Sequence, residues 1–171
     1  AIMHYRFWLT AAALAASIGL AVPAHAAGAP PFGSAVSVSE TFAIDPIFDA
    51  RLRWENVDQA ISNADAVTIR VRSGAELKHA SGLSLLAEGE ATLALNEDYN
   101  AFPFALASSQ RRPQFATVAD PETVELNRLQ VQYKGKIGAM TLGRQRINLD
   151  DQRWIGSVPW RQNEQTFDAV R

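Results

Sequence analysis

Cysteine is absent from the 171 residues, and histidine occurs only three times. The absence of cysteine excludes disulfide bonds, thiolate nucleophiles and zinc–thiolate sites. Two of the histidines, His4 and His25, fall in a segment that we expect to be removed, so the mature chain keeps only His79. Because a single imidazole supports few metal sites or histidine-based triads, we expect neither a metal site nor a cofactor.

An excess of basic residues is also missing. The sequence has 16 Lys and Arg against 18 Asp and Glu, a formal net charge of -2. A nucleic-acid-binding domain carries a clear basic excess, so we expect no nucleic-acid partner. Hydrophobic residues make up 47% and charged residues 20%, which is typical of a folded chain rather than a disordered one.

Long apolar runs are confined to the N-terminus. Arg6 is the only charged side chain before Glu40, and an apolar stretch over residues 7–22 follows it. A basic start, a short apolar core and a small-x-small end are typical of a secretory signal peptide. We therefore predict a signal peptide over residues 1–26. Residues 27–46, rich in Ala, Gly, Pro and Ser, are expected to form a flexible leader.

From residue 47 onward, apolar and polar side chains alternate with a period of two. This alternation is typical of a strand with one apolar and one polar face. The predicted strands cover residues 48–57, 66–78, 83–95, 125–134 and 136–147, and a sixth strand begins within 166–171. Most of them are longer than the usual 5 to 6 residues and reach the roughly 9 to 11 that a tilted strand needs to cross a bilayer.

Long links alternate with short ones along the predicted strands. The links at 79–82 and Gly135 are short, whereas those at 58–65, 96–124 and 148–165 are longer. Outer-membrane barrels alternate in this way, and the smallest have 8 strands. We therefore predict an all-β fold in which residues 47–171 form the first five to six strands of a large antiparallel transmembrane β-barrel, which these strands alone leave incomplete.

If the apolar face meets lipid, the polar face lines a lumen. The arginines assigned to that face are Arg51, Arg53, Arg70, Arg72, Arg128, Arg144 and Arg146. The two-residue spacing of Arg144 and Arg146 predicts that both point to one side. A planar guanidinium suits carboxylates and phosphates, so a wall of arginine favours anionic solutes. The alternative is that the arginines pair with glutamates across strands and fill the lumen.

The residues from Gly143 onward form a more specific block. It contains Gly143-Arg144-Gln145, Asp151-Gln-Arg153-Trp154-Ile-Gly156, Trp160-Arg161-Gln162 and Gln165-Thr166-Phe167-Asp168. This block resembles the alginate-export family of outer-membrane porins. The resemblance implies a single-chain barrel of roughly 16–18 strands. It also implies passage of an anionic polysaccharide through an arginine-lined pore, with Arg144, Arg146, Arg153 and Arg161 at or near the constriction.

The sequence therefore predicts a porin in the outer membrane of a Gram-negative bacterium, and not an enzyme. Its expected partners are outer-membrane lipid, a polar or anionic solute or polysaccharide, and the barrel-assembly machinery. The alternative is a secreted soluble β-domain with a surface-binding or glycosidase-type role. Glu88 and Glu90 are two residues apart on one strand, which fits the roughly 5–10 Å between the carboxyl groups of a glycosidase.

Overall fold

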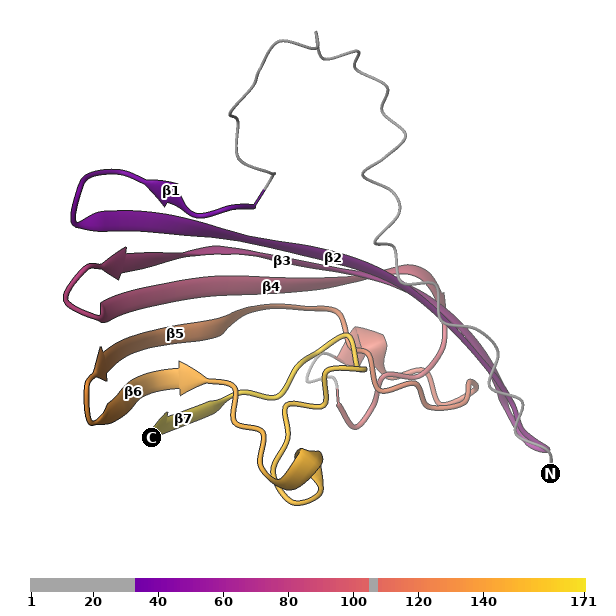
Figure 1. Ribbon diagram of the computed structural model, residues 1–171. Helices are drawn as coiled ribbons and strands as arrows, with labels where there is room; N and C mark the ends of the chain where they lie inside the picture. The colour runs from indigo at the N-terminus through magenta and orange to yellow at the C-terminus, as the bar shows by residue number, and fades with distance from the viewer. Residues whose placement is uncertain (1–32, 105–107) are drawn as a thin grey trace, which may run out of the picture.

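The protein forms one antiparallel sheet whose strand order follows the sequence. The computed structural model describes residues 33–104 and 108–171, and the predicted signal peptide lies outside them. Figure 1 shows a curved sheet with its long links on the concave side. The strands are β1 (Val36–Ser37), β2 (Phe42–Asp58), β3 (Asn63–His79), β4 (Leu83–Asp98), β5 (Thr123–Gly135), β6 (Gly138–Gln145) and β7 (Phe167–Val170).

Two short 3-10 turns interrupt the long links. They are η2 (Ser108–Gln110), between β4 and β5, and η3 (Asp150–Gln152), between β6 and β7. Within the described part of the chain, no helix has the length and apolar character needed to cross a bilayer.

The all-β prediction is confirmed, and each of the six predicted strands is present. The first long strand begins at Phe42, so the predicted boundary between leader and sheet at residue 47 is too late. The short strand β1 also falls within the predicted leader and pairs with β2. Apolar residues continue at even positions back through Ile44 to Phe42, but Pro46 hides the pattern because proline is uncommon within strands.

The three short turns lie together at one end of the sheet, as Figure 1 shows. They span residues 38–41, 80–82 and 136–137. The opposite end carries the links 59–62, 99–122 and 146–166. The link predicted at 58–65 shortens to 59–62 because β2 and β3 extend until Asp58 pairs with Asn63.

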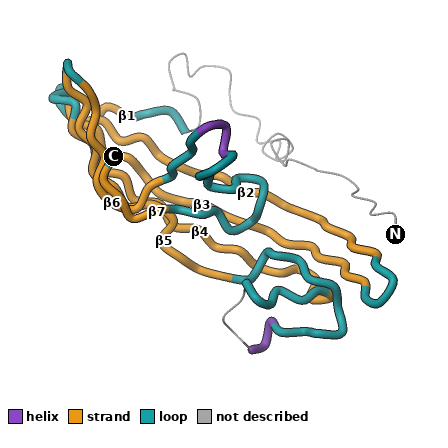
Figure 2. Tube along the Cα trace, turned by 90° about the horizontal axis from the view of Figure 1, so that it is seen from below, coloured by secondary structure: helices purple, strands orange, loops and turns teal. Residues whose placement is uncertain are grey.

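The polarity of the sheet is the reverse of that in a soluble protein. We call the face covered by links 99–122 and 146–166 the inner face and the opposite one the outer face; Figure 2 shows both links lying over the same side of the strands. On the inner face Arg70 and Glu88 are buried, with relative exposures of 1% and 2%. On the outer face Leu85 and Leu93 are 47% and 53% exposed. Such an inverted pattern fits a sheet whose outer face meets lipid.

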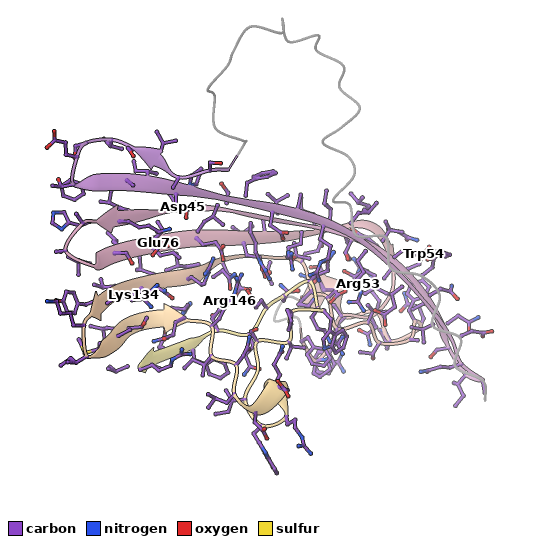
Figure 3. The ribbon with its side chains drawn as sticks, in the orientation of Figure 1. Asp45, Arg53, Trp54, Glu76, Lys134 and Arg146 are labelled. Carbon is purple, nitrogen blue, oxygen red and sulfur yellow. The ribbon has the colours of Figure 1, made fainter. Side chains whose placement is uncertain are left out.

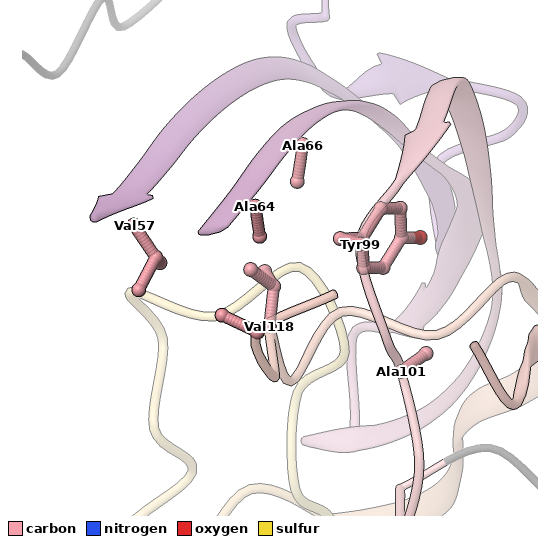
Figure 4. Close-up of a cluster of buried hydrophobic side chains, with 7 residues drawn as sticks. Val57, Ala64, Ala66, Tyr99, Ala101 and Val118 are labelled. Atoms are coloured by element: carbon pink, nitrogen blue, oxygen red, sulfur yellow. The ribbon is translucent and has the colours of Figure 1, made fainter. Parts of the chain in front are cut away.

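A small apolar cluster holds link 99–122 against the inner face of β2 and β3 (Figure 4). The cluster consists of Val57, Ala64, Ala66, Tyr99, Ala101, Ala116 and Val118. The Tyr99 hydroxyl donates a hydrogen bond of 2.8 Å to the carbonyl of Asp120. Burial, together with the charges of Glu122 and Asp120, raises the pKa of Tyr99 to about 12, so the phenol stays protonated and remains a donor. The described residues of this link are therefore packed against the sheet.

A charged substitution on the outer face should destabilise the protein in a membrane. We expect Val71→Arg, at the middle of β3, to lower the unfolding free energy of the full-length protein in lipid vesicles by about 2–4 kcal/mol. Gln130→Arg places the same side chain on the inner face and should cost much less. Denaturant titration of both variants measures the difference, and equal losses would contradict the assignment of the two faces.

Candidate functional site

The carboxylate of Glu88 is the centre of an ionic network on the inner face. It accepts hydrogen bonds from Arg128 at 2.9 and 2.6 Å, from Asn127 at 2.8 Å and from Arg146 at 3.3 Å. The pairing of β4 with β5 shifts at Glu88/Gly89, which is a β-bulge. Because a bulge places two residues of one strand opposite one residue of its partner, Asn127 and Arg128 both reach Glu88.

Link 146–166 contributes a second carboxylate to this network. Glu164 accepts hydrogen bonds from Arg146 at 2.5 Å and from Asn127 at 3.2 Å. It also lies 3.1 Å from a guanidinium nitrogen of Arg72, which in turn is bonded to Glu90. The backbone N–H of Glu164 donates to Glu90 at 3.2 Å. The link thus places its own negative charge among the arginines of the sheet.

Further polar contacts fix the same link to β2 and β3. Arg51 donates to the carbonyls of Pro159 at 2.7 Å and Arg161 at 3.2 Å. Gln162 is completely buried and donates to the carbonyl and the hydroxyl of Thr68, both at 3.0 Å. These contacts hold the backbone on both sides of Arg161, so the link is immobilised by the sheet.

The structure places six of the nine predicted arginines on the inner face: Arg51, Arg53, Arg70, Arg72, Arg128 and Arg146. Five of these pair with carboxylates, and Arg51 binds backbone carbonyls instead. Figure 3 shows Arg53 and Arg146 on the side of the sheet where the links lie. The ion pairs are Arg53 with Asp120 and Glu55, Arg70 with Asp49, Arg72 with Glu90 and Glu164, Arg128 with Glu88, and Arg146 with Glu88 and Glu164. The arrangement corresponds to the charge-paired alternative considered from the sequence.

The prediction that Arg144 and Arg146 share one face is wrong. Arg144 lies opposite Leu129 and Asp168 in the sheet register, which places it on the outer face. There it forms a bidentate ion pair with Asp168, in which Nε and Nη2 of Arg144 each donate to a carboxylate oxygen at 2.9 Å. Strand β6 ends at Gln145, so the period-two rule does not extend to Arg146, whose side chain turns to the inner face.

The remaining two predicted arginines belong to link 146–166. Arg153 follows η3, is exposed, and forms no ion pair with a described residue. The guanidinium of Arg161 lies over the ring of Trp160, with 4.2 Å from its central carbon to the ring centroid. Sequence reasoning missed Glu164, Gln162 and Asn127, since none of them lies in a charged pattern and their partners are far away in the chain.

The two acids that suggested a glycosidase are occupied by arginines. Glu88 is held by Arg128 and Arg146, and Glu90 by Arg72, and both acids are 2% exposed. The described residues also contain no group of three or more side chains suited to hold a metal ion. The geometry on the inner face is therefore that of a neutralised polar wall, and no observation favours two catalytic carboxyl groups.

Breaking the network should be costly. Glu88→Ala leaves Arg128 and Arg146 without their shared carboxylate, and removal of one partner of a buried pair costs about 3–5 kcal/mol. Glu97→Gln removes one partner of the exposed Glu97–Arg112 ion pair near the end of β4, and since exposed pairs contribute about 0–1 kcal/mol, it should change the unfolding free energy far less. Guanidinium unfolding of the full-length protein in micelles compares the two. A Glu88→Ala variant as stable as Glu97→Gln would show that the network does not stabilise the sheet.

A family model described as alginate export matches residues 48–171, which include both long links and most of the sheet. The chain matches no curated protein and no solved structure. The family consists of outer-membrane export porins with a β-barrel fold, which are transporters rather than enzymes. The resemblance inferred from the block after Gly143 is thereby confirmed. This chain belongs to the alginate-export family.

Proposed function

We propose that the protein is an outer-membrane channel of a Gram-negative bacterium that passes anionic polysaccharide, or other polar anionic solutes, through an arginine-rich pore. The observation that carries this proposal is the inverted polarity of the sheet. All of its arginines except Arg144 are gathered on the inner face, while leucine, valine and phenylalanine side chains are exposed on the outer face. The family supports the export role, since its model is that of alginate export.

The ion pairs shape how such a pore treats an anion. Each inner-face guanidinium is held at a fixed position by a carboxylate or a carbonyl. Its side chain therefore loses little conformational entropy when a solute binds. Conduction requires binding that is favourable enough for entry and weak enough for release. Partly neutralised arginines at several places meet both requirements.

The proposed partners follow from the two faces. The exposed apolar side chains of the outer face fit outer-membrane lipid, and insertion of such a sheet calls for the barrel-assembly machinery. Anionic or hydroxyl-rich solutes fit the inner face, because guanidinium groups bind carboxylates with a planar pair of donors.

Channel recordings test the proposal directly. The full-length protein in planar bilayers should conduct ions and show an anion preference in a salt gradient, measured as the reversal potential. Arg146→Ala removes an inner-face cation and should lower the ratio of anion to cation permeability by about twofold. Arg144→Ala is the matched control: it removes the same charge two residues away on the outer face and should leave the ratio unchanged. A protein without conductance, or with a cation preference, would overturn the proposal.

A further inference from the structure

The arginines of the links differ from those of the strands. The strand arginines on the inner face are tied to carboxylates or carbonyls, and this includes Arg53, whose guanidinium carbon also lies 5.8 Å from the Trp160 centroid. By contrast, Arg111 and Arg161 face aromatic rings. Neither of these two has a carboxylate within ion-pair distance among residues 33–104 and 108–171. The arginines free to meet the charge of a ligand therefore lie on the link layer rather than on the sheet wall.

These two arginines are part of an aromatic–arginine patch formed by both long links. The patch consists of Phe102, Phe104, Arg111, Trp160 and Arg161. The guanidinium carbon of Arg161 lies 4.2 Å from the Trp160 centroid and 5.9 Å from that of Phe104, so this side chain joins the two links. The guanidinium carbon of Arg111 lies 4.8 Å from the Phe102 centroid.

The rings of the patch are exposed although they lie on the polar side of the sheet. Phe102, Phe104 and Trp160 have relative exposures of 43%, 56% and 46%. The exposed apolar side chains of the strands belong to the outer face, where lipid accounts for them. Lipid does not account for these three, because the links that carry them cover the inner face (Figure 2).

The backbone beneath the patch is fixed before any ligand arrives. Arg51 binds the carbonyls of Pro159 and Arg161, and Gln162 is buried against Thr68. Trp160 therefore presents its exposed ring from an anchored segment. Preorganised groups of this kind bind with little loss of conformational freedom.

We propose that the aromatic–arginine patch binds a uronic-acid unit of an anionic polysaccharide. A pyranose ring has a face of C–H groups, which packs on the electron-rich face of an aromatic ring. Its carboxylate is a partner for the planar guanidinium of Arg161. A site with both chemistries selects a sugar that carries a charge over a neutral sugar or a small anion. This inference rests on the proposed function and assigns its recognition step to the links.

Block of the ion current tests the inference. An alginate hexasaccharide is added to the full-length protein in planar bilayers, and maltohexaose serves as the neutral probe. Trp160→Ala and Arg161→Gln should each raise the half-blocking concentration of the alginate hexasaccharide by about tenfold. Arg161→Gln should leave the weak block by maltohexaose unchanged. Trp160→Phe keeps an aromatic face and should retain most of the affinity.

Trp54→Ala is the matched control, since Trp54 is an equally exposed tryptophan of the outer face, and its block should equal that of the wild type. Heat-modifiable migration on gels verifies folding, and Arg161→Gln carries the test if Trp160→Ala does not fold. A conducting, anion-selective wild type with unchanged block in folded Trp160→Ala and Arg161→Gln overturns the inference alone. A wild type that does not conduct overturns the proposed function and the inference with it.

Discussion

Charge neutralisation on one face of the sheet is the constraint that organises this structure. Because the outer face is apolar, every charged strand residue except the Arg144–Asp168 pair has to find its partner on the inner side or near a strand end. Glu88 and Glu164 neutralise most of this charge, since together they bind arginines from β3, β5 and the end of β6. A buried guanidinium without a carboxylate costs several kcal/mol, so these partners are required for the sheet to hold its shape.

The same constraint explains why the long links fold inward. Link 146–166 supplies Glu164 and the carbonyls that bind Arg51. Link 99–122 supplies Asp120, which binds Arg53. The apolar cluster around Tyr99 is small, so the links are held to the sheet mainly by hydrogen bonds and ion pairs. Once fixed, the links carry the only described arginines that lie over aromatic rings without a carboxylate partner, and recognition of a sugar is assigned to them for that reason.

The strands could be predicted from the sequence because alternation is a local property, visible within ten residues. The limits of that rule appear where a strand ends: Arg146 lies one residue beyond β6, and its face could not be inferred from Arg144. Glu164 and Gln162 could not be assigned at all, since their partners Glu90 and Thr68 are 74 and 94 residues away. The family block after Gly143 marked this segment as specific without indicating which side chains would be buried.

The proposed channel requires that the outer face of the sheet meets lipid and that the inner face lines the lumen. Since these 171 residues contain no cysteine, single cysteines can be introduced along β5 at positions 129–133 of the full-length protein and spin-labelled in lipid vesicles. Electron paramagnetic resonance then measures collisions with oxygen, which concentrates in lipid, and with a water-soluble nickel complex. We expect oxygen access at positions Leu129, Val131 and Tyr133 and nickel access at positions Gln130 and Gln132. Nickel access at all five positions, or the opposite alternation, would contradict it.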